Sequence, residues 1–239
     1  MKKKVLFVVT SHGELGDTGK KTGYFLSEVT HPWSVISAEY DIDVVSPKGG
    51  RPPVDGFDLS DAINRQYWDS PEWQDKMSTT MTPDEVDPSA YCAIFYAGGH
   101  GAMWDFPDNV DLAKIAQTIY EAGGFVAAVC HGPAGLINIK LSDGSSLVKG
   151  RKVDSFTNAE EEANGTAGVV PFLLQTALEQ KGADFECGQP WSDHVVRDGR
   201  LITGQNPMSA LDLGKTLLAA LKESEGLGGL IEEIKNKIS

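Results

Sequence analysis

The chain has 239 residues, of which 41% are hydrophobic, and its formal net charge is −13. That charge disfavours nucleic acid or an anionic membrane surface as a partner, and the three cysteines form no disulfide framework. No apolar run approaches the length of a membrane span, and the apolar run 5–9 is too short for a secretion signal. We therefore expect a cytoplasmic protein in a reducing compartment.

Apolar runs that alternate with amphipathic stretches predict the elements in chain order. Strands are expected at 4–10, 43–47, 92–97, 125–129, 153–157 and 183–187, a hairpin at 195–203, and helices at 22–38, 110–122, 171–181 and from 206 onward. This alternation predicts one α/β domain over 1–239, with a mostly parallel sheet covered by helices on both faces. A glycine-containing break is expected before a short amphipathic tail that contains Leu230, Ile231, Ile234 and Ile238.

Residues 48–90 contain many helix and strand breakers together with several aromatic residues. Long irregular segments in compact domains are usually functional or disordered, and the aromatic residues favour an ordered segment here. We therefore expect a lid or cap insertion, with short helices within 60–77.

The segment Phe125–Val129 predicts a buried strand that ends abruptly at Cys130. Gly132 allows a tight turn, and Pro133 suits the first turn of a following helix. This pattern is typical of a strand–nucleophile–helix elbow with cysteine in place of serine, and the helix N-terminus would favour the thiolate. The alternative is that Cys130 is a small buried core residue.

One carboxyl group interrupts an apolar helix face. Glu28 shares its predicted helical stripe with Phe25, Val29, Val35 and Ile36. A buried glutamate is rare unless it is paired or protonated. The alternative is that Pro32 kinks the helix and turns this carboxyl group toward solvent.

Two further stretches follow predicted strands. Gly98 and Gly99 would let backbone N–H groups approach a ligand closely, as an oxyanion hole requires, and the loop is expected to continue through residues 102–109. Glu160, Glu161 and Glu162 form an acidic run that is commonly a solvated loop or helix start, although one of the three could turn inward.

Several motifs resemble the ThiJ/PfpI superfamily, which is related to class I glutamine amidotransferases. They are Ala128–Val129–Cys130–His131–Gly132–Pro133, Ala97–Gly98–Gly99–His100–Gly101, the stretch from Gly23 to Pro32, and 198–204 with Asn206–Pro207. The resemblance covers essentially the whole chain and implies a flavodoxin-like three-layer sandwich. Residues 26–32 point to the stress-induced branch of heat-shock chaperones with glyoxalase III activity.

The resemblance also implies a role for each site residue. Cys130 matches the nucleophile, His131 its general base and Glu161 the acidic third member, in a register uncertain by one residue because three glutamates are adjacent. Glu28 matches a protonated carboxyl group beside the thiol. Gly98, Gly99 and His100 match the substrate and oxyanion site. No metal or organic cofactor is required, and the candidate zinc ligands, which are His12, Glu14, His100 and His131, lack standard spacing.

The implied activity is conversion of methylglyoxal to lactate without glutathione, through a Cys130 hemithioacetal, with deglycase action as an addition. The alternatives are a holdase chaperone, which needs an exposed apolar surface, and a cysteine amidase, peptidase or other hydratase on the same elbow. The expected partners are accordingly a small 2-oxoaldehyde and unfolded or glycated proteins. A homodimer is expected, and the tail would dock on the body or on a partner subunit.

Overall fold

The computed structural model describes residues 3–238, and the side chains of residues 3–229. Its centre is a six-stranded sheet in the order β3-β1-β5-β6-β10-β9. These strands are β1 (Lys4–Val8), β3 (Asp41–Val45), β5 (Tyr91–Tyr96), β6 (Phe125–Val129), β9 (Val195–Asp198) and β10 (Leu201–Gly204). All neighbours are parallel except β9, which pairs with β10 in the predicted hairpin. The order reverses between β1 and β5, and such a reversal opens a crevice at the carboxyl ends of the strands.

Two short parallel pairs lie outside this sheet. They are β2 (Tyr24–Phe25) with β4 (Val54–Asp55), and β7 (Lys152–Val153) with β8 (Asp184–Phe185). The predicted strand 153–157 is therefore mostly wrong. Beyond Val153 the chain instead bonds to the ends of β6 and β10, through Phe156 N–H to the Cys130 carbonyl at 2.8 Å and Asp154 N–H to Thr203 Oγ1 at 2.9 Å.

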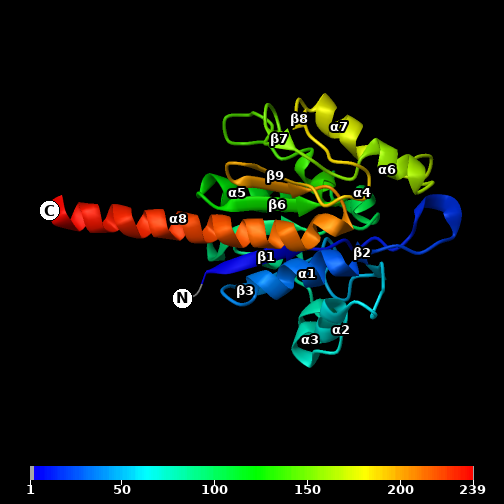
Figure 1. Cartoon of the computed structure of the whole chain (residues 1–239), viewed down its shortest axis with the longest axis horizontal. Coiled ribbons are helices and arrows are strands. Elements are labelled where there is room, and N and C mark those ends of the chain that lie inside the picture. The colour runs from blue at the N-terminus through cyan, green and yellow to red at the C-terminus, as the bar shows by residue number, and fades with distance from the viewer. Residues whose placement is uncertain (1–2, 239) are drawn as a thin grey trace.

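Helices cover both faces of the sheet, which confirms the predicted three-layer sandwich (Figure 1). The helices are α1 (Leu26–Ile36), α2 (Ala62–Trp68), α3 (Pro71–Ser78), α4 (Ala102–Asp105), α5 (Val110–Glu121), α6 (Asn158–Ala163), α7 (Leu174–Gln180) and α8 (Ala210–Ile238). Because side chains alternate across a strand, Val5 and Phe7 of β1 enter the core beneath α1 and α8, whereas Leu6 and Val8 enter the core that includes α5. None of the described helices has both the length and the apolar character that crossing a membrane requires.

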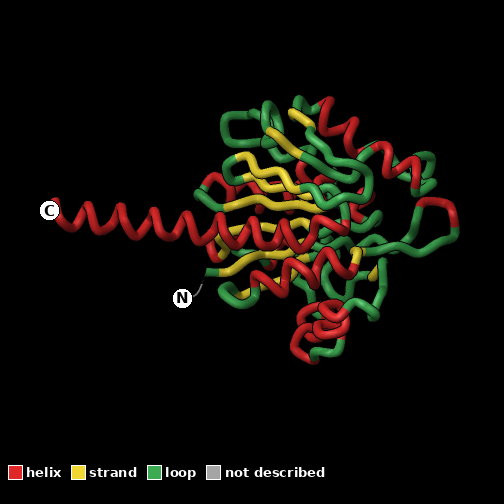
Figure 2. Tube along the Cα trace, viewed as in Figure 1, coloured by secondary structure: helices red, strands yellow, loops and turns green. Residues whose placement is uncertain are grey.

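Helix α8 is continuous to Ile238, so the predicted break before the tail is wrong. Figures 1 and 2 show its C-terminal half projecting past the sheet. Glycine costs about 1 kcal/mol in a helix, but Gly226, Gly228 and Gly229 are flanked by Leu, Glu, Ile and Lys, most of which favour helix. The tail side chains on which docking was predicted lie outside the described residues.

The segment 48–90 is ordered, and its short helices α2 and α3 confirm the expectation for 60–77. These helices lie beside α1 (Figure 1). The Trp73 ring packs edge-on against Trp33 of α1, with the ring centroids 6.3 Å apart. The segment also supplies β4, and through it Asp55, to the crevice described below. Its role as a lid stays a prediction.

The loop predicted for 102–109 contains the short helix α4, which is a further correction. The helix is anchored where Asp105 accepts hydrogen bonds from Thr10 Oγ1 at 2.8 Å and the Ser11 N–H at 2.7 Å. Four residues are too few to produce a helical pattern in the sequence.

Candidate active site

The chain leaves β6 through a strained elbow at Cys130. Its φ is 59°, a left-handed conformation that costs a non-glycine residue about 1–2 kcal/mol. The Cys130 N–H donates to the Gly204 carbonyl at 2.8 Å, which holds the turn in place. Glycine is required at position 132, because a Cβ there would lie 2.2 Å from the Tyr96 carbonyl oxygen. The predicted nucleophile elbow is therefore present in its backbone geometry.

The segment after the elbow is η4 (Gly132–Leu136), a five-residue 3₁₀ turn rather than the predicted α-helix. Burial raises the pKa of the Cys130 thiol, while the facing Gly99 N–H acts to lower it. The expectation of a thiolate stabilised by a helix N-terminus is therefore wrong. In the resting protein Cys130 is a thiol, and a base must take its proton.

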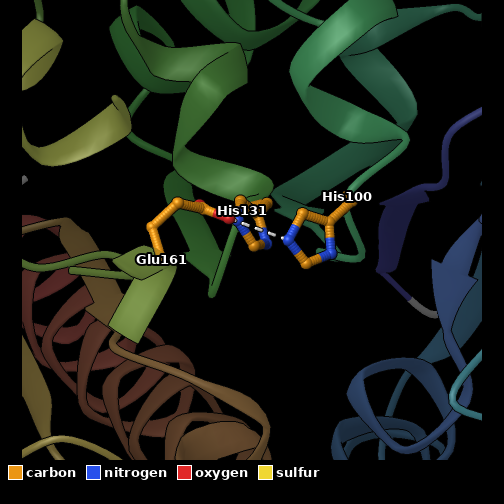
Figure 3. A group of neighbouring side chains, drawn as sticks. All are labelled: His100, His131 and Glu161. Carbon is orange, nitrogen blue, oxygen red and sulfur yellow. Dashed lines mark hydrogen bonds and ion pairs between the residues drawn. The ribbon is translucent and has the colours of Figure 1, made fainter. Parts of the chain in front are cut away.

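His131 is a base within reach of the thiol, because the Sγ atom of Cys130 lies 3.4 Å from its Nδ1. On the other side of the ring, Nε2 of His131 lies 2.8 Å from Oε2 of Glu161, and Figure 3 draws these two side chains together. Burial lowers the pKa of His131 to about 4, so the imidazole is neutral at pH 7. Although burial opposes ionisation of Glu161, hydrogen bonds from His100, His131 and Thr166 lower its pKa. A carboxylate can only accept hydrogen bonds, so the contact with Glu161 assigns the imidazole proton of His131 to Nε2. Nδ1 is then free to accept a hydrogen bond from the thiol.

Glu161 is shared by two histidines. His100 Nε2 lies 2.9 Å from Oε1 of Glu161, and Thr166 donates its hydroxyl proton to the same oxygen. The His100 and His131 rings lie side by side, with centroids 4.1 Å apart (Figure 3). Of the three adjacent glutamates, the structure thus brings Glu161 to the histidine, and it ties His100 to the same carboxylate.

Glu28 is fully buried, so the alternative in which Pro32 turns it toward solvent is wrong. Its carboxyl group faces the Cys130 thiol and the Gly98 backbone, yet neither oxygen meets hydrogen-bond geometry. Burial raises the pKa of Glu28 to about 8, so the group is protonated at pH 7. The Cys130 thiol thus lies near a neutral base, His131, and a neutral acid, Glu28.

The two glycines after β5 pack too closely for any side chain. A Cβ on Gly98 would lie 2.4 Å from Glu28 Oε2, and one on Gly99 would lie 2.1 Å from the Gly23 carbonyl oxygen. Gly99 also has a φ of 100°, a conformation that favours glycine. Because its N–H faces the Cys130 sulfur, it lies where an oxyanion formed on an atom bonded to sulfur would be stabilised.

These groups open into a pocket of about 250 Å³. Its polar lining includes Asp55, Gly99, His100, Cys130, His131 and Asn164, and its apolar lining includes Phe25, Phe156, Trp191, Pro207 and Met208. Apolar side chains thus form one part of the wall, and the Cys130 thiol, both imidazoles and the Asp55 carboxyl group are among the polar groups that form the other. Such a pocket suits a small, neutral, partly apolar ligand.

The model of the DJ-1/PfpI family matches residues 21–220. The chain belongs to the DJ-1/PfpI family. Among the curated relatives of this DJ-1/PfpI protein, glyoxalase 3 of Candida albicans is 34% identical, with 92% of this chain and 98% of the relative covered. The glutathione-independent glyoxalase HSP31 of Saccharomyces cerevisiae is also 34% identical, with the same coverage.

Solved structures agree with this assignment. Rapid Encystment Protein 24 kDa of Francisella tularensis superposes with a TM-score of 0.88 at 38% identity, covering 92% of this chain and 99% of that one. Glyoxalase III from Candida albicans gives 0.86 at 33% identity, covering 92% and 97%. The resemblance to the ThiJ/PfpI superfamily and its glyoxalase III branch is therefore confirmed.

Several residues of the site in this DJ-1/PfpI protein were not predicted, among them Asp55, Phe156, Thr166 and Trp191. None follows a predicted strand with a distinctive motif. The choice among the three glutamates did have a usable signal, since Thr157 and Glu160 form a capping box that fixes the start of α6. Once Glu160 is tied to the cap, Glu161 is the next acid to consider.

The side chains of His100, His131 and Glu161 also form the kind of set that binds a metal ion, with ligand atoms within 4.8 Å of one another. Two histidines and one carboxylate are a known ligand set for zinc. His12 and Glu14 are not part of this group, because His12 Nε2 bonds the Glu14 carbonyl oxygen at 2.7 Å in a separate loop. That the reaction needs no metal stays a prediction.

Proposed function

We propose that this protein is a glutathione-independent glyoxalase that converts methylglyoxal to lactate, with Cys130 as its nucleophile. The observation that carries the proposal is the 3.4 Å contact between the Cys130 thiol and the unprotonated Nδ1 of His131, beside the buried acid Glu28. A glyoxalase that uses no glutathione must supply its own thiol, and this one has a base beside it. The names of its relatives support the same activity.

The first step forms a carbon–sulfur bond. His131 Nδ1 takes the thiol proton as the sulfur adds to the aldehyde carbon of methylglyoxal. The new alkoxide lies near the Gly99 N–H, and the proton on Nδ1 then moves to it, which gives a neutral hemithioacetal. Glu161 stabilises the transient imidazolium, because its carboxylate holds the Nε2 proton throughout.

The second step moves hydrogen between neighbouring carbons. His131 removes the proton from the former aldehyde carbon, while Glu28 gives its proton to the ketone oxygen, and an enediol results. A proton returned to the second carbon and the loss of the hydroxyl proton on the first carbon leave a thioester. The first carbon is oxidised and the second is reduced, so no external oxidant is needed. Water then hydrolyses the thioester to lactate and the free thiol.

The pocket chemistry suits this sequence because the three groups that exchange protons with the substrate start neutral. Burial favours neutral forms of the thiol, the imidazole of His131 and the Glu28 carboxyl group. An uncharged 2-oxoaldehyde enters such a site without bringing an unpaired charge into it. The product carries a carboxylate, which the nearby Glu161 and Asp55 disfavour, so release is assisted.

The test is lactate formation from methylglyoxal by the purified protein without added thiol. Wild type should be active, and Cys130→Ala should be inactive. Cys187→Ala is the matched control, because Cys187 is an exposed thiol that does not line the pocket, and it should behave as wild type. Lactate production by Cys130→Ala, or an inactive wild type, would contradict the proposal.

A further inference from the structure

The mechanism does not use the buried carboxylate of Glu160. Glu160 is fully buried, and its two oxygens accept five hydrogen bonds from neutral donors. The backbone N–H and the hydroxyl of Thr157 donate to Oε2 at 2.9 and 2.8 Å. The donors to Oε1 are the backbone N–H of Trp191 at 2.8 Å, Nε2 of Gln205 at 3.0 Å and Nδ2 of Asn206 at 2.8 Å. Helix capping explains only the first two bonds. The other three hydrogen bonds fix the loop that contains Trp191 and the residues that precede the last helical segment to the same carboxylate.

Trp191 is held in an unusual backbone conformation at that point. Its φ is 63°, and Cys130 is the only other non-glycine residue with a positive φ in the described part of the chain. A bulky side chain rarely occupies this region, so the surrounding contacts must impose it. The bond from its N–H to Glu160 is one such contact.

The conformation places the indole ring on the wall of the pocket. Its ring packs edge-on against Phe156 at 5.4 Å, and Phe156 in turn packs against His131 at 4.4 Å. Trp191 as a whole residue is still 44% exposed, and Phe25 and Met208 also line this pocket. An apolar compartment, formed by Phe25, Phe156, Trp191 and Met208, therefore adjoins Cys130 and His131.

The pocket as a whole is larger than methylglyoxal requires. Each molecule of liquid water takes roughly 30 Å³, and the pocket holds about 250 Å³, whereas methylglyoxal carries only a methyl group on its ketone carbon. A larger apolar group on that carbon would leave water and contact the aromatic wall, both of which favour binding.

We propose that Trp191 is a specificity-determining residue that favours 2-oxoaldehydes with an aromatic substituent, such as phenylglyoxal, and that Glu160 is the positioning residue that holds Trp191 in place. The inference rests on the proposed function and deepens it. The chemistry is unchanged, since phenylglyoxal and water give mandelate by the same thiol addition, hydrogen transfer and hydrolysis. Two neighbouring glutamates thus support two parts of one pocket: Glu161 holds the base His131, and Glu160 holds Trp191 in the apolar wall.

The experiment measures kcat and KM for phenylglyoxal and for methylglyoxal. In Trp191→Ala the ratio of kcat/KM for phenylglyoxal over methylglyoxal should fall by roughly tenfold, mainly through a higher KM for phenylglyoxal. Trp191→Phe, which restores an aromatic ring, should recover most of the ratio. Glu160→Gln should also lower the ratio, because the amide NH₂ group of glutamine would face groups that themselves donate hydrogen bonds. Glu162→Gln is the matched control on the same helix, and its exposed side chain predicts an unchanged ratio.

A double variant tests whether the two residues act together. If Glu160 acts through Trp191, Glu160→Gln combined with Trp191→Ala should lower the ratio no further than Trp191→Ala alone. Should Glu160→Gln fail to fold, Glu160→Asp keeps the charge while shortening its reach to the Trp191 N–H, and it should show the same loss. Equal losses for both substrates would mean that Glu160 is only structural and would overturn its assigned role.

Binding of acetophenone, an aromatic ketone without the reactive aldehyde, separates this inference from the proposed function. Calorimetry should show weaker binding to Trp191→Ala than to wild type or Glu162→Gln, whether or not the protein turns over any aldehyde. Methylglyoxal turnover together with an unchanged selectivity ratio in Trp191→Ala overturns the specificity inference alone. The protein could instead be inactive toward both aldehydes and still bind acetophenone in a way that depends on Trp191. That result would overturn the glyoxalase assignment and support the role of Trp191 in binding aromatic groups.

Discussion

The carboxylate of Glu161 accepts the Nε2 proton of His131 across 2.8 Å, and this contact decides which imidazole nitrogen faces the nucleophile. With the proton fixed on Nε2, the lone pair of Nδ1 points to the Cys130 sulfur 3.4 Å away. His131 and Glu161 are 30 positions apart in the sequence, and they meet because α6 begins where the chain passes the end of β6. Activation of the thiol therefore depends on a residue that never touches it.

Glu161→Gln should lose turnover on the order of 10³-fold or more while keeping its fold. The glutamine amide can donate to Nε2, which favours the tautomer with a proton on Nδ1, and that nitrogen could then no longer accept from the thiol. Lactate formation from methylglyoxal measures the loss. Glu162→Gln is the exposed control and should retain wild-type rates. Near-normal turnover in Glu161→Gln would show that the carboxylate does not set the tautomer.

The pH dependence of kcat/KM should follow the ionisation of two buried groups, Glu28 and His131. The mechanism needs Glu28 with its proton, and the pKa of Glu28 is raised to about 8, so the rate should fall about tenfold per pH unit above that value. It also needs His131 without a second proton, and burial lowers the pKa of His131 to about 4, so the acidic fall should come only near that pH. Steady-state rates in overlapping buffers test both limbs. A profile that stays flat through pH 8 would contradict the role given to Glu28.

The sequence shows those parts of the site that are local, and little of the rest. The elbow was found because its strand, nucleophile and turn are contiguous from Phe125 to Pro133, and Glu28 was found because it breaks an apolar stripe. Trp191 was missed because its place depends on a hydrogen bond to Glu160, distant in sequence, and on a backbone conformation that tryptophan does not favour. Likewise, the continuity of α8 could not be predicted through three glycines, whose cost the neighbouring helix formers offset.

Burial of Glu28 should also appear in the stability of the protein. Its pKa is raised from 4.5 to about 8 on folding, so its contribution is fully present below pH 4.5 and is lost as the pH rises toward 8. In that window the unfolded chain releases this proton and the folded chain keeps it. The free energy of unfolding of wild type should therefore fall, relative to Glu28→Gln, by about 1.4 kcal/mol per pH unit. Urea denaturation of both proteins at matched pH measures the difference.

The comparison with Glu28→Gln removes the effect of other groups. His131 acts with the opposite sign, because its pKa is lowered on folding and its contribution is lost as the pH falls through about 4. That term is common to both proteins and cancels in the difference. Parallel stability curves for the two proteins between pH 4.5 and 8 would mean that Glu28 ionises normally in the folded state.

Gly98→Ala should damage both stability and turnover, because three atoms of the site surround the place where a Cβ would stand. That carbon would lie 2.4 Å from Glu28 Oε2, 2.6 Å from the Val129 carbonyl oxygen and 2.8 Å from the His131 N–H nitrogen. Two of the three are backbone atoms that cannot rotate away, so relief must come from shifting the elbow or the Glu28 carboxyl group. We expect a loss of roughly 1–3 kcal/mol in the free energy of unfolding and a large fall in kcat.

Gly168→Ala is the matched control for Gly98→Ala, since a Cβ there meets nothing within 4 Å. It should unfold at the same temperature as wild type and turn over methylglyoxal at the same rate. A Gly98→Ala protein indistinguishable from this control would show that the close packing of Glu28 against the strand end is not needed for catalysis.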